Sequence, residues 1–254
     1  MNWCVASASS TGTSHLSKGI ECQDASSFAF IESVCKKQKT LLAVLSDGAG
    51  NSKQAARASR LVCRYLINCA EHWLKKSHQI DLSGLLLHSA GYARQALVRV
   101  ASSEGVSISE FSATCLCLLI KEDFFAALQV GDGLIIIENP ARSISPLFWP
   151  CRYEYANTTT FLTSRNWHQD LQYAQWSAPI SFFFLCSDGI QSICSYSQLM
   201  TVVPGFTDAF KRVLRGEQQG YSKPASKKIL AFLESDQVSS RTDDDKTVLI
   251  GIND

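Results

Sequence analysis

Net charge and long apolar runs are both scarce in this chain. The formal net charge is +1 at pH 7, so no field of one sign would steer the chain toward nucleic acid or an anionic membrane. No apolar run approaches the roughly 20 residues that cross a bilayer. Residues 1–7 have neither the cationic start nor the apolar stretch of a signal peptide. We therefore expect a soluble, cytoplasmic protein that binds neither nucleic acid nor membrane.

The motifs of several common enzyme classes are also missing. The ten cysteines include no Cys-x-x-Cys pair, and most lie inside apolar segments, as reduced core thiols do. The five histidines lack the spacing of a zinc site. There is no Gly-x-x-x-x-Gly-Lys-Ser/Thr loop, His-Glu-x-x-His or Gly-x-Ser-x-Gly, and no cysteine has Arg six positions later. These absences disfavour a zinc enzyme and a thiol-based mechanism.

What the sequence does have is a large apolar share, 46%, arranged in short runs. Runs typical of strands cover residues 3–9, 25–34, 41–46, 112–120, 124–130, 134–137, 181–186 and 248–252. Apolar residues at three- and four-residue intervals predict helices over residues 56–76, 86–100, 196–203, 207–214 and 227–233. Strands and helices do not alternate strictly, which favours helices layered on a sheet. Because no linker or repeat interrupts the chain, we expect one domain over residues 1–254.

One stretch, from about residue 140 to residue 179, is less regular. It holds three of the five tryptophans, Trp149, Trp167 and Trp176. Such a stretch either forms a flap that faces the substrate or packs under a long loop. The sequence leaves both interpretations open.

Acidic residues recur at the ends of the apolar runs. Asp47 follows the run 41–46, Asp188 follows 181–186, Asp132 lies between two glycines, and Asp243, Asp244 and Asp245 precede the last strand. Taken singly, each Asp-Gly is more simply a turn, and the acidic triplet a solvated loop. Taken together, they suggest a shared cation, because two carboxylates about 4 Å apart repel by roughly 4 kcal/mol at an effective dielectric constant of about 20. All-oxygen ligation favours Mg²⁺ or Mn²⁺ over zinc.

Two basic residues near the N-terminus are candidates for binding phosphate. His15 could position a phosphate or donate a proton, although a lone histidine is more often a structural hydrogen-bonding group. Lys18 is either solvated or in contact with phosphate. Thr114 is most simply a residue that packs or hydrogen-bonds within its strand.

An ordered series of short motifs carries a family resemblance. They are Cys22-Gln23-Asp24, Asp47-Gly48-Ala49-Gly50, Ala113-Thr114, Gly131-Asp132-Gly133, Ser187-Asp188-Gly189-Ile190 and Asp244-Asp245-Lys246-Thr247. In this order they resemble the PP2C-type metal-dependent protein serine/threonine phosphatases, and their spelling resembles the bacterial PphC-like branch. The resemblance implies an α+β fold, a four-layer α/β/β/α sandwich with two central antiparallel sheets flanked by helices.

The resemblance also implies a role for each acidic residue. Asp47 would bridge two metal ions, with the Gly48 carbonyl on one of them, and Asp188 and Asp244 would bind the other. Asp24 would hold metal-bound water, and Asp132 matches the acid of a third, weaker metal. Asp47, Asp188 and Asp244 are thus the predicted catalytic residues, with two or three Mn²⁺ or Mg²⁺ ions as cofactors.

The function that follows from the resemblance is hydrolysis of phosphoserine and phosphothreonine in proteins by a metal-bridged hydroxide. The partners would be a phosphorylated protein and a serine/threonine kinase. Two departures from the family pattern affect the phosphate contact and the proton donor: Gly19 stands where many members have Arg, and Ala49 where some have His. They leave two alternatives: a catalytically weak, metal-holding regulatory module that binds a phosphorylated partner, and a phosphoesterase for small molecules.

Overall fold

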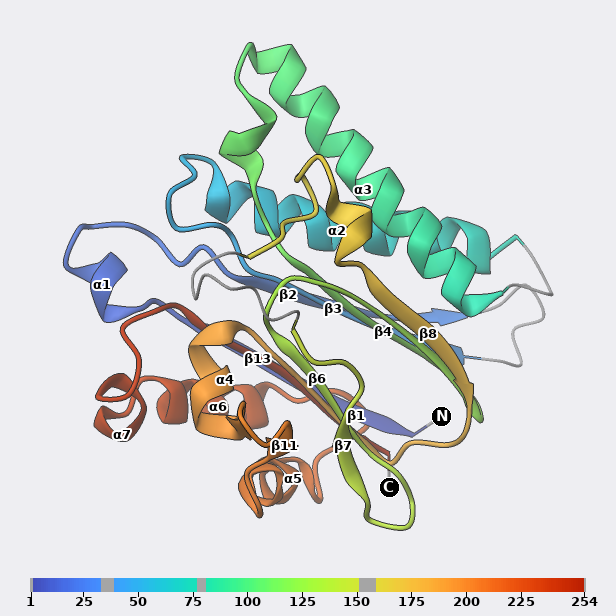
Figure 1. Cartoon of the computed structure of the whole chain (residues 1–254). Coiled ribbons are helices and arrows are strands. Elements are labelled where there is room, and N and C mark those ends of the chain that lie inside the picture. The colour runs from blue at the N-terminus through green and yellow to red at the C-terminus, as the bar shows by residue number, and fades with distance from the viewer. Residues whose placement is uncertain (1, 33–38, 77–80, 151–158, 254) are drawn as a thin grey trace.

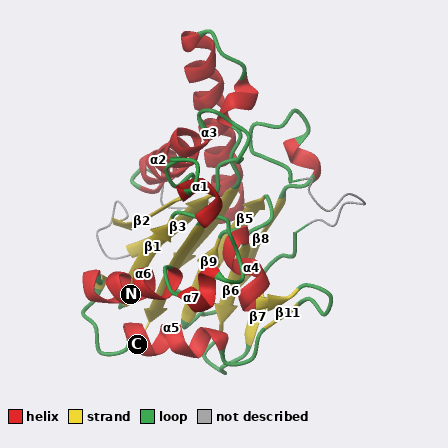
Figure 2. Cartoon of the chain, turned by 90° about the vertical axis from the view of Figure 1, so that its left-hand side faces the viewer, coloured by secondary structure: helices red, strands yellow, loops and turns green. Residues whose placement is uncertain are grey.

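The computed structural model describes residues 2–32, 39–76, 81–150 and 159–253. Within these residues two β-sheets lie face to face, and each carries helices on its outer side (Figure 1). Figure 2 shows the same order of layers from a direction 90° away. The predicted four-layer α+β sandwich is therefore confirmed.

The strands form two large sheets and one small hairpin. The first sheet consists, in spatial order, of β2 (Ala25–Glu32), β3 (Lys39–Ser46), β4 (Cys115–Lys121), β5 (Phe124–Val130) and β8 (Gln172–Ser177). The second consists of β12 (Gly220–Tyr221), β1 (Trp3–Ser10), β13 (Lys246–Asn253), β9 (Phe182–Cys186), β6 (Leu134–Glu138) and β7 (Ile144–Pro146). The hairpin pairs β10 (Ser195–Tyr196) with β11 (Thr201–Val202). Of the described strand pairs, β1 with β12 is parallel and the others are antiparallel.

The helices fall into two outer layers and a short connection. The described helices are α1 (Thr13–Leu16), α2 (Ala55–Leu74), α3 (Leu82–Glu104), α4 (Asp188–Cys194), α5 (Phe206–Leu214), α6 (Lys223–Leu233) and α7 (Asp236–Ser239), with 3₁₀ turns η1 (Ile108–Phe111) and η2 (Trp167–Gln169). Helices α2 and α3 cover the first sheet, and α4 to α7 cover the second (Figure 1). No helix in the described ranges is long and apolar enough to cross a membrane.

Three apolar cores explain why several strands are apolar at nearly every position. Leu42 and Val44 of β3 face α2 and α3, while the alternate residues Leu41, Ala43 and Leu45 face the other sheet. Both faces of this strand are therefore buried, and alternation between apolar and polar residues disappears. The same holds for β4 and β9, whose residues are buried apart from Lys121 at the end of β4. Such fully buried strands bring their terminal acids to the edge of the core.

Most of the predicted elements are present, but the helix predicted over residues 196–203 is wrong. This stretch forms β10, a turn and β11. The β-branched and aromatic residues Tyr196, Thr201, Val202 and Val203 favour strand over helix. A short helix, α4, begins instead at Asp188, directly after β9.

The irregular stretch at 140–179 contains β7, η2 and β8, while its residues 151–158 lie outside the described ranges. Two of its tryptophans are packing residues. Trp167 is buried in the core under α2 and α3, and Trp176 stacks on Phe125 with ring centroids 4.8 Å apart. Packing therefore accounts for these two aromatic residues.

Candidate metal and phosphate site

Three carboxylates from different strand ends meet at one end of the sandwich. Asp47 follows β3 of the first sheet, Asp188 follows β9 of the second, and Asp132 lies in the turn that joins β5 to β6. Each of the three offers an oxygen atom, and these atoms all lie within 4.8 Å of one another. Residues 56 or more positions apart thus form one acidic group, as the pattern of acidic strand ends predicted.

The mutual proximity of these carboxylates changes their pKa values. Burial first, and then the charges of Asp24 and Asp188, raise the pKa of Asp47 well above its usual value. Burial, followed by the charges of Asp132 and Asp244, raises the pKa of Asp188 to about 7, while a hydrogen bond with Asp47 opposes the rise. Burial also raises the pKa of Asp132. Each shift means that the folded protein disfavours the ionised form in the absence of a positive charge.

A divalent cation fits this group of oxygen atoms. The Oδ1 atom of Asp188 is buried and has no hydrogen-bond partner among the described residues. No described Lys, Arg or His lies within ion-pair distance of Asp47, Asp132 or Asp188. Because Mg²⁺ and Mn²⁺ prefer oxygen ligands, the donor set suits them. A cation would supply the positive charge that the surrounding side chains do not.

Gly48 lies at the closest approach of the site to helix α2. A Cβ atom on this residue would come within 2.6 Å of the Ala55 carbonyl oxygen, so only glycine fits. The Gly48 N–H donates to the Gln23 carbonyl over 3.2 Å. No described backbone N–H outside the regular helices and strands donates to the Gly48 carbonyl, which leaves this oxygen suitable as a ligand.

Asp24 is a buried acid next to the group. It is 5% exposed, and its Oδ2 accepts a hydrogen bond from Ser187 Oγ over 2.7 Å. Burial is the main cause that raises the pKa of Asp24 to about 7, with the charges of Asp245 and Asp188 adding to the rise. Its other oxygen, Oδ1, has no described hydrogen-bond partner. Ser187 was not predicted to contribute, although a serine directly precedes both Asp47 and Asp188 in the sequence.

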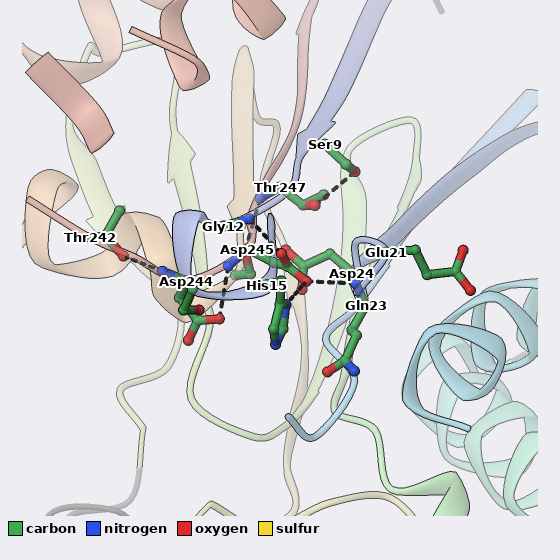
Figure 3. Close-up of polar contacts among 12 residues, drawn as sticks. Ser9, Gly12, His15, Glu21, Gln23, Asp24, Thr242, Asp244, Asp245 and Thr247 are labelled. Carbon is green, nitrogen blue, oxygen red and sulfur yellow. Dashed lines mark hydrogen bonds and ion pairs between the residues drawn. The ribbon is translucent and has the colours of Figure 1, made fainter. Parts of the chain in front are cut away.

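The acidic triplet before β13 divides into exposed and buried members. Asp244 is exposed, yet its charge raises the pKa of both Asp132 and Asp188, so it borders the group without belonging to the three mutually close carboxylates. Asp245 is 2% exposed and turns inward. It accepts the Gly12 N–H over 2.7 Å and the Gln23 N–H over 2.6 Å (Figure 3). The family resemblance assigned a metal-binding role to Asp244, whereas no role was predicted for Asp245.

The two basic candidates differ in their surroundings. His15 is 7% exposed, and its Nδ1 lies 3.0 Å from Asp245 Oδ2 (Figure 3). Lys18 is exposed and forms no ion pair with any described carboxylate. The structure thus brings His15, and not Lys18, into contact with the acidic residues around the site.

The sequence model of the protein phosphatase 2C family matches residues 11–234, most of the chain. The chain belongs to this family. A curated relative, serine/threonine-protein phosphatase 3 of Escherichia coli (strain K12), is 28% identical over 257 residues, covering 99% of this chain and 99% of the relative. The predicted family and enzyme class, a protein serine/threonine phosphatase, are therefore confirmed.

Solved structures share the fold of this protein phosphatase 2C chain. PppA, described as a key regulatory component of T6SS in Pseudomonas aeruginosa, is 18% identical, with a TM-score of 0.64 and coverage of 99% of this chain and 98% of that one. RsbX in complex with magnesium is 15% identical, with a TM-score of 0.57 and coverage of 98% and 94%. Because this family is metal-dependent, the prediction that the enzyme uses metal ions is confirmed at that level.

Both departures from the protein phosphatase 2C pattern leave the site without a basic side chain at the expected place. Gly19 is exposed and has φ +66°, a conformation that suits glycine. Ala49 is 7% exposed. A basic group for the substrate must therefore come from elsewhere in this chain.

Thr159 connects the stretch 140–179 to the acidic group. Its Oγ1 donates a hydrogen bond to Asp132 Oδ2, and this bond opposes the rise in the pKa of Asp132. Sequence reasoning missed this residue because no local pattern marks it: the partner lies 27 positions away.

Thr114 was expected to pack or hydrogen-bond within its strand, and in the structure it hydrogen-bonds to Asp47 and fixes the loop that begins there. Its Oγ1 accepts the Asp47 N–H over 2.8 Å, and its own N–H donates to the Asp47 carbonyl over 2.7 Å. We expect Thr114→Val to leave the Asp47 N–H without an acceptor, lowering the free energy of unfolding by about 1–3 kcal/mol and weakening metal affinity. Thermal unfolding and metal titration measure both effects. Thr114→Ser keeps the hydroxyl and should lose much less, and equal losses would contradict this role.

Proposed function

We propose that this protein phosphatase uses two Mn²⁺ or Mg²⁺ ions to hydrolyse phosphoserine and phosphothreonine in other proteins. Asp47, the Gly48 carbonyl, Asp188 and Asp244 would hold the two ions, with Asp24 orienting water beside them. Asp132 would bind a third, weaker ion. When bound, such ions activate water for attack on phosphorus and offset the charge of the phosphoryl group.

One observation carries the proposal: the oxygens of Asp47, Asp132 and Asp188 lie within 4.8 Å of one another without a described basic partner. Carboxylates so placed repel unless they take up protons or a cation. Where no cation is bound, the raised pKa values of Asp47 and Asp188 favour the first course, with one proton shared between the two carboxylates. A cation would replace the shared proton and leave both groups ionised. The magnesium complex of RsbX, a protein of similar fold, supports Mg²⁺ as one of the candidates.

We also propose that the chain forms one domain, works in the cytoplasm and is opposed by a partner kinase. The two ends of the described chain pair with each other as β1 and β13, which supports one domain over residues 1–254. No disulfide joins the described cysteines, even where Cys115 and Cys117 place their sulfur atoms 3.6 Å apart, as is usual in a reducing compartment such as the cytoplasm. A serine/threonine kinase that phosphorylates the same substrate is the expected partner in regulation.

The test is release of phosphate from a phosphoserine peptide with and without Mn²⁺ or Mg²⁺. We expect turnover that requires the metal, and a loss on the order of 10³-fold or more in Asp188→Ala, since metal ions contribute several kcal/mol to such reactions. The matched control is Asp123→Ala, because Asp123 lies in the turn at the opposite end of β4 and β5. Activity that survives a chelator or Asp188→Ala rules the mechanism out.

The same assay tests the two alternatives, neither of which the family match favours. A regulatory module would bind metal and phosphopeptide with negligible turnover. A small-molecule phosphoesterase would prefer nucleotides or sugar phosphates to the peptide.

A further inference from the structure

Asp245 ties the connection between β1 and β2 to the start of β13. Its two oxygens accept the N–H groups of Gly12 and Gln23, which lie at the two ends of this connection (Figure 3). The connection is also pressed closely against the triplet: a Cβ atom on Gly12 would come within 2.3 Å of the Asp244 carbonyl carbon. One buried carboxylate therefore fixes the path of residues 12–23 relative to Asp244, which lies just before β13.

His15 lies in the middle of this fixed connection, in the short helix α1. Its imidazole is almost fully buried, with Nδ1 3.0 Å from Asp245 Oδ2. The opposite ring nitrogen, Nε2, points away from Asp245 (Figure 3). It lies 3.9 Å from the position of a Cβ atom on Gly50, in the loop that begins with Asp47 and Gly48. The ring thus lies between Asp245 and the loop that carries the proposed ligands Asp47 and Gly48.

The chemistry of the site calls for a proton donor. Cleavage of a phosphoserine ester leaves an alkoxide oxygen, which is a poor leaving group unless it receives a proton. The carboxylates that hold cations must be ionised and cannot supply it. Among the described residues, His15 is the basic side chain within ion-pair distance of Asp245, the buried member of the acidic triplet beside the site. Histidine is the side chain that most often transfers protons in enzymes.

We propose that His15 donates the proton to the leaving serine or threonine oxygen, and that Asp245 is its positioning residue. This rests on the proposed function. Water forms the new bond to phosphorus and releases one proton to solvent. The bond from phosphorus to the ester oxygen breaks, its electron pair stays on that oxygen, and the oxygen takes the proton from Nε2. His15 regains a proton from solvent before the next turnover.

The experiment compares two substrates in His15→Gln. A phosphoserine peptide needs a proton on its leaving oxygen, whereas p-nitrophenyl phosphate releases a stable anion that needs none. We expect kcat for the peptide to fall roughly 10²-fold or more, the usual contribution of a positioned proton donor, while kcat for p-nitrophenyl phosphate changes little. His72→Gln, which changes an exposed histidine on α2, should alter neither. Stabilisation by Mg²⁺ should be the same in His15→Gln and the wild type.

Other outcomes would overturn the proposal. An equal fall in kcat on both substrates would make His15 a phosphate contact or a structural residue. An unchanged kcat on the peptide would show that His15 takes no part in the reaction. If the wild type itself shows no metal-dependent turnover of either substrate, the proposed function has failed, and that result is visible before any variant is made.

Asp245→Asn tests the positioning role. The amide keeps the shape of the side chain but cannot accept both backbone hydrogen bonds and also face the imidazole. We expect the peptide to lose more activity than p-nitrophenyl phosphate, in the same direction as in His15→Gln but by a smaller factor. If both substrates lose activity equally, Asp245 only holds the connection in place, and the positioning claim is wrong.

Discussion

Asp47→Asn is expected to abolish phosphopeptide hydrolysis while making the metal-free protein more stable. Activity should fall on the order of 10³-fold or more, because the amide removes the charge that would hold the cations. The free energy of unfolding should rise, because Asp47 is a half-buried carboxylate near Asp24, Asp132 and Asp188, and desolvation together with these charges raises its pKa well above the usual value. An uncharged side chain of the same shape removes that repulsion.

The size of the stabilisation can be bounded. Two unit charges about 4 Å apart repel by roughly 4 kcal/mol at an effective dielectric constant of about 20, and proton sharing between Asp47 and Asp188 already relieves part of this. A gain of about 1–2 kcal/mol would raise the melting temperature of a chain this long by roughly 2–8 °C. Calorimetry in the presence of chelator measures it, alongside the phosphopeptide assay.

The matched control for Asp47→Asn is Asp123→Asn. Asp123 is exposed in the turn between β4 and β5, at the end of these strands away from the site. It should change neither activity nor stability appreciably. If Asp47→Asn were inactive but melted at a lower temperature than the wild type, Asp47 would be a structural residue. Its charge would then not lower the stability of the metal-free protein.

The sequence allowed the buried strands, the helical layers and the acidic group to be predicted because they depend on local signals, whereas the sandwich of two sheets was implied by the family resemblance. Apolar runs such as 41–46 and 181–186 indicate buried strands, and an acid directly after such a strand must lie at the edge of the core. Two strands of this kind, one in each sheet, bring Asp47 and Asp188 together. Their closeness could be expected because isolated buried carboxylates are costly.

The role of Asp245 could not be predicted, because it depends on contacts between distant segments. In a run of three aspartates, which side chain turns inward is decided by the register of β13 against β1, where Lys246 pairs with Ser10. The hydrogen-bond partners of Asp245 are more than 200 positions away. Thr159 and Ser187 were missed for the same reason. The strand β10 was missed because the spacing of apolar residues at 196–203 was given more weight than their β-branched character.

Metal-free protein is expected to lose stability as the pH rises from about 4 to about 7, the reverse of the usual acid denaturation of carboxylate-paired proteins. Burial raises the folded-state pKa of Asp24 and of Asp188 to about 7, compared with 3.8 for an unperturbed carboxyl. Between these values the folded state binds more protons than the unfolded state. The free energy of unfolding therefore falls with rising pH through this window and stays low above it.

Divalent cations should reverse this loss, and their effect should grow with pH. A cation that binds only the folded state adds RT ln(1 + [L]/Kd), about 2.7 kcal/mol at a concentration one hundred times Kd. Near pH 5, protons on Asp24, Asp47 and Asp188 compete with the cation. Near pH 8, the carboxylates can ionise and bind it. We therefore expect Mg²⁺ or Mn²⁺ to raise the melting temperature by roughly 5–10 °C near pH 8 and by much less near pH 5.

Melting curves at several pH values measure how stability depends on pH with chelator and with excess cation. The variant Asp47→Asn separates the contribution of the site from that of the other titrating groups of the chain. This variant removes one of the three mutually close carboxylates and with it a charge that faces both Asp24 and Asp188. Its metal-free melting temperature should depend less on pH, and added cation should shift it little. A wild type whose metal-free stability is flat or rises between about pH 4 and pH 7 would show that these carboxylates do not retain their protons in the folded state. In that case the acidic group would not need a cation, and the main physical argument for the two-metal site would be lost.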